Sequence, residues 1–541
     1  MRWWGWGEDG AAVKLPEPAA RLLREELDLS GDERGEHVEL SEVRLPDPRL
    51  PEPTRRSLAS AVGQENVLDS REERVTHAAG RSYPDLVRLR GGDASGAPDA
   101  IVAPASGEQV APVLKACAEA GVAVIPFGGG TSVVGGVEAL RGPHAAAVSL
   151  DLRRMDRILE VDRDSLTARL EPGLMGPQLE RLLGEAGLTL GHFPQSFEFS
   201  TVGGWVATRS AGQASTGYGR IDALVEALRC ETPVGGLSTR NAPASAAGPS
   251  LREVMMGSEG TFGVITEATL RVRPAPASRH YEGWSFSTFE EGVRALRVLE
   301  QGGAAPDVAR LADVDETRLT MALGSTGSVA DRAGRAYLRL RGHEQGCLAF
   351  TGFEGTHEEV ARRRGRAASI LRAAGGLSLG ERPGRAWLRG RFSAPYLRDE
   401  LLDRGVMVET LETAAPWSAL LAVHATVGGA LREALTGRGT PPAVMCHVSH
   451  LYPSGASLYF TFLARQERGT ELAQWRVAKS AASQAIHASG GTITHHHAVG
   501  TDHAPWMPAE VGPLGVEVLR AVKQRLDPTG VMNPEKLLPE R

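Results

Sequence analysis

The sequence predicts an α+β protein of two or three domains, and three observations support this prediction. First, the chain has 541 residues, which exceeds what one hydrophobic core usually needs, because domains hold roughly 100–200 residues each. Second, short apolar runs typical of strands alternate with helical patterns between residues 100 and 276. Third, prolines cluster at residues 45–53 and 274–276. These clusters indicate boundaries, because each proline fixes φ and removes a hydrogen-bond donor.

The composition is that of an ordinary soluble globular protein. Hydrophobic residues make up 42%, charged residues make up 23%, and the formal net charge is −6. This balance argues against a nucleic-acid partner held by a basic field. Four widely spaced cysteines form no CxxC motif, so we expect inert thiols in a reducing cytosol: Cys117, Cys230, Cys347 and Cys446.

The expected location is the cytoplasm. The first residues lack the apolar segment of a signal peptide, and no run of 18 apolar residues occurs. Residues 19–29 predict a short amphipathic helix within an N-terminal appendage. Its apolar side favours packing or a dimer contact, and peripheral contact with a membrane stays open as the alternative.

Local signals predict the elements that follow the appendage. Ser106 and Gln109 form the pattern of a capping box, which opens a helix that ends at Gly121. Residues 101–102, 122–126, 148–152 and 263–273 predict strands, residues 157–171 predict a hairpin around a turn at 162–165, and residues 511–526 predict a helix. Residues 235–250 and 324–334 are expected to be loops, because they are rich in small and polar residues.

A glycine loop at residues 126–132 directly follows an apolar strand. Its three consecutive glycines leave main-chain N–H groups uncovered, and such groups can surround anionic oxygens. It is not a phosphate-binding P-loop, because no Gly-Lys-Ser/Thr ends it. Taken alone, it is equally compatible with a flexible connector.

Two further segments rich in small and hydroxyl residues follow, at 194–211 and 257–265. Three such loops are hard to explain as connectors, whereas a dinucleotide needs long backbone contact of this kind. The candidate cofactor-binding residues are Pro126, Phe127, Gly128, Gly129, Gly130, Thr131, Ser132, Gln195, Ser196, Phe197, Glu198, Phe199, Ser200, Thr201, Thr208, Arg209, Ser210, Ala211, Gly257, Ser258, Glu259, Gly260, Thr261, Phe262 and Gly263.

These loops, in this order and spacing, resemble the FAD domain of the vanillyl-alcohol-oxidase superfamily. Within it the chain resembles the alkylglycerone-phosphate synthases over nearly its whole length. The likeness includes the Trp-rich start at residues 4–7, the segments 256–269, 395–399 and 411–417, and the triple histidine that ends segment 490–497.

The resemblance implies a two-subdomain FAD-binding domain of the vanillyl-alcohol-oxidase (PCMH) type with an α+β substrate cap. We expect an N-terminal helical appendage and connector at residues 1–96, the FAD domain at 97–277, the cap at 278–500, and a segment at 501–541 that returns to the FAD domain. It also implies non-covalent FAD, which agrees with the absence of His and Cys from the glycine loop.

The implied reaction exchanges the acyl group of acyl-dihydroxyacetone phosphate for a long-chain alcohol, through an adduct at flavin N5, and gives an ether lipid. The resemblance assigns catalytic roles to Tyr459, Arg310 and the histidine tract (His495, His496 and His497), and it assigns the substrate phosphate to Arg398. We expect no resident metal. A homodimer is the expected assembly, with a small molecule or lipid as substrate.

The residues themselves leave alternatives open. Tyr459 on an alternating strand is compatible with a core aromatic, and most arginines are solvated. On a strand, His495 and His497 would share a face that His496 opposes. The tract is compatible with proton transfer, with structural hydrogen bonding, or with a metal site helped by Asp502 and His503.

One departure from the family concerns the segment after the histidines. Residues 498–506 lack the basic stretch that the family carries there, which weakens the case for a doubly anionic phosphate. Two other functions therefore stay open. One is an FAD oxidase or dehydrogenase acting on a 2-hydroxy acid or a related small alcohol, and the other is a flavin-binding module without chemistry.

Overall fold

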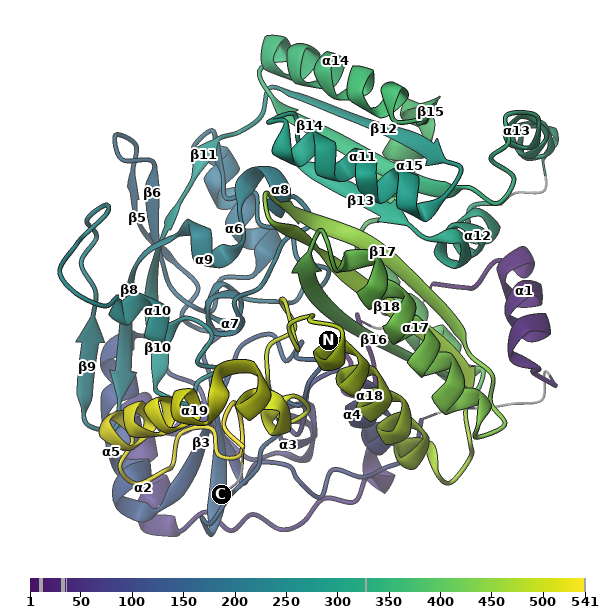
Figure 1. Cartoon of the computed structure of the whole chain (residues 1–541). Coiled ribbons are helices and arrows are strands. Elements are labelled where there is room, and N and C mark those ends of the chain that lie inside the picture. Colours follow the sequence, from purple (N-terminus) through teal and green to yellow (C-terminus); the bar gives the residue numbers. More distant parts are fainter. Residues whose placement is uncertain (9–12, 31–34, 36, 326–327, 540–541) are drawn as a thin grey trace.

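The computed structural model describes residues 1–8, 13–30, 35, 37–325 and 328–539. The first half of the chain is built around two sheets, and residues 278–465 form a third, larger sheet (Figure 1). The C-terminal helix α19 (Met507–Leu526) crosses back over the first half. The α+β architecture is therefore the one that the sequence predicts.

A four-stranded sheet in the order β1-β2-β4-β3 carries the glycine loop. Its strands are β1 (Val67–Leu68), β2 (Ala100–Val102), β3 (Val122–Phe127) and β4 (Ala146–Asp151). β2 and β3 both run parallel to β4, and β4 is buried along its whole length, as in a sheet covered on both faces. The main chain at Val124 also bonds to Val531 and Asn533, so the chain end joins the open edge of β3.

Helices α2 (Glu52–Val62) and α5 (Gly107–Ala120) pack together beside this sheet. Ser106 does precede α5, but the predicted capping box is wrong in detail. The Ser106 hydroxyl makes no cap bond, and the Gln109 side chain accepts the N–H of Ala105 at 2.7 Å instead. The helix ends as predicted, since Gly121 has a φ of +61° that favours glycine.

A second sheet has the order β5-β6-β10-β8-β9. Its strands are β5 (Ile158–Asp162), β6 (Thr167–Leu170), β8 (Val225–Thr232), β9 (Gly235–Ser238) and β10 (Val264–Arg271). The predicted hairpin is confirmed, because β5 pairs antiparallel with β6 and Asp162 accepts the N–H of Ser165 across the turn. The expected loop at 235–250 is partly wrong, since it begins with β9, which pairs with β8.

The third sheet has seven strands in the order β15-β12-β14-β13-β17-β18-β16, all paired antiparallel. Its strands are β12 (Ser278–Phe286), β13 (Val308–Ala312), β14 (Cys347–Gly355), β15 (Leu377–Gly380), β16 (Val406–Pro416), β17 (Ala443–Tyr452) and β18 (Gly455–Arg465). One face packs against the helices α11 (Phe289–Gln301), α14 (His357–Ala373), α17 (Leu420–Thr436) and α18 (Glu471–Ala488).

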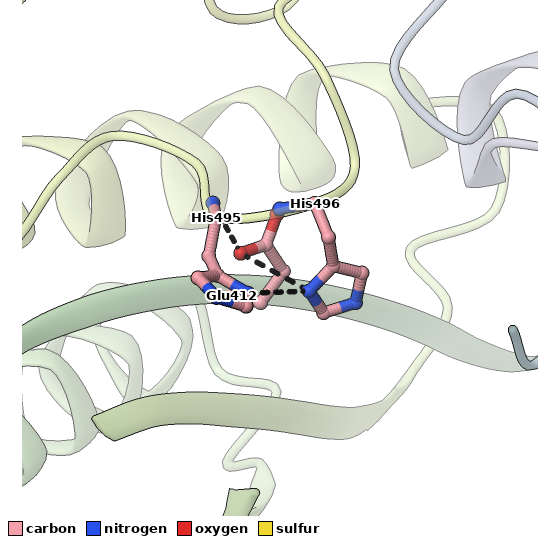
Figure 2. A group of neighbouring side chains, drawn as sticks. All are labelled: Glu412, His495 and His496. Atoms are coloured by element: carbon pink, nitrogen blue, oxygen red, sulfur yellow. Dashed lines mark hydrogen bonds and ion pairs between the residues drawn. The ribbon is translucent and has the colours of Figure 1, made fainter. Parts of the chain in front are cut away.

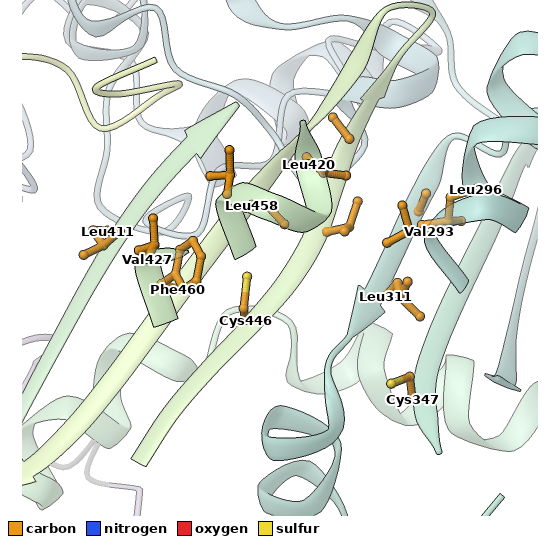
Figure 3. Packing of buried hydrophobic residues seen from close by; sticks show 14 of the residues in the cluster. Val293, Leu296, Leu311, Cys347, Leu411, Leu420, Val427, Cys446, Leu458 and Phe460 are labelled. Atoms are coloured by element: carbon orange, nitrogen blue, oxygen red, sulfur yellow. The ribbon is translucent and has the colours of Figure 1, made fainter. Parts of the chain in front are cut away.

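Side chains along these strands alternate between the two faces of the sheet, so the core residues and the site residues lie on opposite faces. Leu411, Cys446, Leu458 and Phe460 point toward the helices and belong to the largest hydrophobic cluster (Figure 3). The residues between them, such as Tyr459, point to the opposite face, because successive side chains of a strand alternate. The large sheet therefore presents a second, more polar face toward the first half of the chain.

The N-terminal segment packs onto the third sheet. Helix α1 (Glu17–Leu27) corresponds to the helix predicted at 19–29, and its buried side contacts Val406 and Leu463. The main-chain N–H of Trp6 donates to Asp399 in α16 (Ala394–Asp403) at 2.8 Å. The apolar side of α1 is thus covered by protein.

The remaining elements connect these layers. They are α3 (Arg71–Thr76), α4 (Tyr83–Arg90), α6 (Gly176–Glu185), α7 (Val202–Thr208), α8 (Ser215–Tyr218), α9 (Ile221–Leu224), α10 (Leu251–Met255), α12 (Val314–Leu323), α13 (Val329–Leu340), α15 (Glu381–Gly390), β7 (Leu188–Thr189), β11 (Arg273–Pro274) and three 3₁₀ turns, Leu40–Glu42, Gln64–Asn66 and Ala504–Trp506.

Two further predictions need correction, one of a loop and one of a helix. The loop expected at 324–334 is wrong from residue 328 onward, because Ser328 caps helix α13 through a capping box with Asp331; residues 326 and 327 lie outside the described residues. The helix predicted at 511–526 begins earlier, at Met507, and is interrupted at Gly512, whose φ is +76°. Across the described residues, no helix is long and apolar enough to cross a membrane.

The core assignment of β18 can be tested with two matched leucine variants. Leu458 is fully buried, whereas Leu340 in α13 is 85% exposed. Leu458→Ala is expected to lower the free energy of unfolding by about 2–5 kcal/mol, because it leaves a cavity. Leu340→Ala should change it by less than about 0.5 kcal/mol. Urea unfolding followed by circular dichroism measures both, and equal effects would contradict the packing described.

Candidate active site

A cavity of about 820 Å³ lies between the polar face of the large sheet and the three predicted cofactor loops. All of residues 126–132 line it. Glycine is required where the first loop meets the second, because a Cβ on Gly129 would lie 1.8 Å from the carbonyl oxygen of Phe199. Gly130 has a φ of +65°, which also favours glycine.

Some residues of the second loop line the cavity, and the others contact neighbouring side chains outside it. Gln195, Ser196, Ser200, Thr201, Thr208, Ser210 and Ala211 line the cavity. The other predicted residues lie outside the lining: Phe197 stacks on Phe392, Glu198 accepts the Tyr396 hydroxyl at 2.7 Å, Phe199 packs against Tyr396, and Arg209 binds Glu253.

The third loop lines the cavity through Glu259, Gly260 and Gly263, whereas Gly257, Ser258, Thr261 and Phe262 lie behind it. The Glu259 carboxylate accepts the N–H groups of Val499 and Gly500, both at 2.8 Å. Burial raises the pKa of Glu259 to about 7, against the opposing charge of Lys536. Glu259 therefore fastens the returning C-terminal segment to this loop.

The donor set of the three loops fits a dinucleotide. Their cavity side presents glycine main chain and the hydroxyls of Thr131, Ser132, Ser196, Ser200 and Thr201. These neutral groups suit pyrophosphate and sugar oxygens. Behind them, the Ser258 and Thr261 hydroxyls are buried without a hydrogen-bond partner in the described part of the chain.

Tyr459 lies on the polar face of the large sheet, where its ring stacks on His447 at a centroid distance of 5.0 Å. The rings of His496 and His497 lie 5.9 Å and 5.4 Å from it. Burial raises the pKa of Tyr459 above its ordinary value, although the hydroxyl of Thr410 and the charge of Arg398 oppose this. Tyr459 is thus a protonated phenol at the cavity wall rather than a core aromatic.

A buried carboxylate that the sequence did not single out organises the neighbouring groups. Glu316, at the start of α12, binds Arg310 at 2.5 Å and the Nδ1 atom of His447 at 2.9 Å. Although burial alone would raise it, these two partners hold the pKa of Glu316 at about 2. The positive charge of Arg310 is therefore compensated inside the protein.

The histidine tract is a bend, so the expected strand geometry is wrong. The buried Glu412 carboxylate accepts the main-chain N–H groups of His495, His496 and His497 at 2.5, 3.1 and 2.8 Å. His496 and His497 both line the cavity, whereas His495 turns away and its Nε2 atom bonds to the Tyr452 hydroxyl at 2.7 Å. Glu412 thus sets the backbone curve that aims two adjacent histidines at one space.

Glu412, His495 and His496 bring three side chains of metal-binding type together (Figure 2). Their atoms are already engaged within the protein. Both carboxylate oxygens accept N–H groups, and the Nδ1 atoms of the two rings bond to each other at 3.0 Å. His503 does not join this group, since its Nδ1 atom bonds to the carbonyl of Ala498 at 2.9 Å. The contacts of this cluster are those of hydrogen bonding.

Burial lowers the pKa values of all three tract histidines, while the charge of Glu412 opposes this effect. The rings are therefore neutral at pH 7. The pKa of Glu412 lies well below its usual value despite its burial, because the positive charge that these histidines carry at low pH favours the ionised carboxylate, as does the hydroxyl of Thr494. Neutral imidazoles at the cavity wall can accept a proton.

Arg398 lines the cavity but is fully engaged on its protein side. Its guanidinium binds Glu409 at 3.0 Å and the carbonyl oxygen of Arg81 at 2.8 Å. Both members of the Arg398–Glu409 pair are buried. Removing either would leave an uncompensated charge, so the pair has a structural role whatever else it does.

Asp502 lies apart from the histidines, beside a small cavity of about 100 Å³ that also includes Asp85, Arg88 and Glu138. Its Oδ2 atom is buried without a partner in the described residues. Burial raises the pKa of Asp502 to about 7, although the charge of Lys479 opposes this. Since the ordinary value for this carboxyl is 3.8, Asp502 contributes stability at low pH that is lost as the pH rises from about 4 to 7.

Asp502→Asn is expected to remove this pH dependence. At pH 8 the variant should be more stable than the wild type by roughly 2–4 kcal/mol, because a buried charge is gone. At pH 4 the two should be nearly equal, because the wild-type carboxyl is protonated in the folded state. Urea unfolding at both pH values measures the difference, and a difference independent of pH would contradict the account.

Comparison with known proteins agrees with this geometry. A family model described as an FAD binding domain matches residues 98–239, and a model of the C-terminal domain of FAD linked oxidases matches residues 275–537. FAD is therefore the cofactor of this chain. A structure of p-cresol methylhydroxylase with bound substrate matches at a TM-score of 0.68 and 16% identity, covering 91% of this chain and 99% of that one, which shows a shared fold.

The likeness to one family is much closer. Alkyldihydroxyacetonephosphate synthase of Dictyostelium discoideum is 34% identical over 100% of this chain and 93% of its own length. A solved structure of alkyldihydroxyacetonephosphate synthase matches at a TM-score of 0.87 and 32% identity, covering 99% of both chains. The chain belongs to the alkyldihydroxyacetonephosphate synthase family.

Proposed function

We propose that the protein is an FAD-dependent alkylglycerone-phosphate synthase, which exchanges the acyl group of acyl-dihydroxyacetone phosphate for a long-chain alcohol. The observation that carries this proposal is a single cavity that joins the three cofactor loops to Tyr459, His496 and His497. Membership of the family supports it over the full length of the chain.

The three loops would hold FAD without a covalent bond. The segments 126–132, 194–211 and 257–265 contain no His or Cys that could attach to a flavin. The first loop would surround the pyrophosphate with main-chain N–H groups, and the second would add hydroxyl donors. When bound, FAD supplies the redox-active ring system at which the exchange takes place.

The cavity-facing side chains would handle the protons of the exchange. The alcohol must lose its hydroxyl proton as its oxygen replaces the acyl oxygen on the substrate carbon. His496 and His497 are suited to take that proton, because burial keeps their rings neutral. Tyr459 stays protonated at neutral pH, so its hydroxyl can donate a hydrogen bond to a substrate oxygen.

Part of the cavity lining suits long alkyl chains. It consists of apolar side chains from α12, α15, α16 and the large sheet: Met321, Leu323, Leu348, Phe350, Trp387, Leu397 and Val408. Burying a methylene group there contributes about 0.8 kcal/mol. The proposal therefore includes a lipid substrate against this part of the lining.

The finer points of assembly and location belong to the same proposal. We infer a cytoplasmic homodimer with peripheral membrane contact. Helix α13 supports a contact surface, because Val329, Tyr337 and Leu340 are 72%, 45% and 85% exposed. Light scattering and vesicle flotation test the dimer and the membrane contact separately.

The activity is tested with purified holoenzyme, acyl-dihydroxyacetone phosphate and hexadecanol. Formation of the ether and release of the fatty acid are expected, and holoenzyme that forms no ether would refute the proposal. Anaerobic bleaching of the flavin by a 2-hydroxy acid would favour the oxidoreductase alternative instead.

Tyr459→Phe is expected to lower kcat by about 10²–10⁴-fold, the usual contribution of a positioned proton donor. FAD content should not change, because Tyr459 lies on the large sheet and not on a cofactor loop. Tyr337→Phe in the exposed helix α13 is the matched control. Unchanged turnover in the Tyr459 variant would contradict this role, whereas a wild-type holoenzyme without any turnover would support the alternative of a flavin-binding module without chemistry.

Gly129→Ala is expected to abolish FAD binding, because its Cβ would lie 1.8 Å from the Phe199 carbonyl oxygen and separate two loops. Gly184→Ala is the control, since no atom lies within 4 Å of a Cβ there. Visible flavin absorbance per protein measures the outcome. Normal flavin content in the Gly129 variant would show that these loops do not hold the cofactor.

A further inference from the structure

Three arginines line the large cavity: Arg310, Arg391 and Arg398. Arg310 is paired with Glu316, and Arg398 is paired with Glu409 and a main-chain carbonyl. Their positive charges are compensated by the protein before any ligand enters.

Arg391, directly after helix α15, differs from both. Its Nε and Nη2 atoms are buried and have no hydrogen-bond partner in the described part of the chain. It forms no ion pair with a described carboxylate; the nearby Glu354 instead accepts the hydroxyls of Tyr218 and Tyr281 at 2.7 and 2.6 Å. Burial lowers the pKa of Arg391, but an arginine stays charged at neutral pH.

The position of this guanidinium is fixed. It lies over the rings of Phe193 and Phe392, at 4.6 and 4.9 Å from their centroids, and 5.7 Å from the ring of Trp387. The main-chain carbonyl of Arg391 accepts the side-chain amides of Gln195 and Gln213 at 2.8 and 3.0 Å. Aromatic faces and a fixed backbone therefore hold a charged donor at the cavity wall.

A buried cation with unmet donors is costly unless a ligand satisfies it. The planar fork of an arginine matches the geometry of phosphate and carboxylate. Two N–H groups on adjacent nitrogens, Nε and Nη2, are those that a bidentate oxyanion contacts. The Tyr281 hydroxyl is a neutral acceptor beside the guanidinium, and its hydrogen bond opposes the lowering of the Arg391 pKa by burial.

We propose that Arg391 binds an oxyanion of the substrate. The oxyanion is either the phosphate of the dihydroxyacetone phosphate unit or the carboxylate of the departing fatty acid. The identification of the ligand as substrate rests on the proposed function.

The test compares Arg391→Met with Arg389→Met, an exposed arginine in α15 two residues away. For Arg391→Met, KM for acyl-dihydroxyacetone phosphate is expected to rise about 10–100-fold, the effect of losing hydrogen bonds to a charged group. FAD content should stay at the wild-type level. Arg391→Lys, which keeps the charge but loses the fork, should give an intermediate KM.

Calorimetry with the holoenzyme distinguishes the two sources of the oxyanion without turnover. If the phosphate is the ligand, Arg391→Met weakens the binding of inorganic phosphate. If the fatty-acid carboxylate is the ligand, the same substitution weakens the binding of palmitate. Unchanged binding of both probes with unchanged KM would overturn the proposal. Loss of FAD from the variant would also overturn it, because the anion would then belong to the cofactor.

This design separates the two proposals. A holoenzyme that binds either probe through Arg391 but makes no ether would refute the proposed synthase activity and leave the oxyanion site standing. If the wild type forms the ether and the Arg391→Met enzyme is indistinguishable from it, the synthase activity stands and the oxyanion site is refuted.

Discussion

The site depends first on one buried carboxylate, Glu412. Three successive N–H groups of the histidine tract and the hydroxyl of Thr494 donate to its two oxygens. An isolated charge at that depth would be very costly, but several donors compensate it. Because Glu412 pairs with Tyr459 across β16 and β18, the same strand position aligns the phenol with the histidines. The histidine tract, which lies 83 residues further along the chain, is thus held against this face of the sheet.

The returning C-terminal segment gives the cavity its second wall. Glu259 holds Val499 and Gly500, while the Asn533 side chain donates to the carbonyls of Gly136 and Glu259. The third loop and the segment that follows the first loop are therefore tied to the same stretch of chain, residues 495–533. Since the histidine tract lies in that stretch, the cofactor loops and the proton-handling groups are positioned by one connected set of hydrogen bonds.

The sequence predicted the parts of this arrangement that depend on local chemistry. The glycine loop was recognisable because only glycine allows the close approach seen at Gly129. The hairpin at 157–171 was predicted by its turn residues. Glu412 and Glu316 were not predicted, because a carboxylate that binds groups distant in sequence carries no local pattern. The strand expected at the histidines failed for the same reason: a distant acceptor, not alternation, determines that backbone.

The arginines show why residue type alone does not identify a binding group. The resemblance selects Arg310 and Arg398, and both do reach the cavity, yet each already has a carboxylate partner. These ion pairs give both arginines a structural role, because removing one partner would leave the other charge uncompensated inside the protein. Arg391 has no carboxylate partner in the described residues: aromatic rings and the Tyr281 hydroxyl surround it, and its Nε and Nη2 atoms have no hydrogen-bond partner. The protein therefore leaves the charge of this one cavity arginine without a paired anion, which is why the proposed oxyanion is placed there.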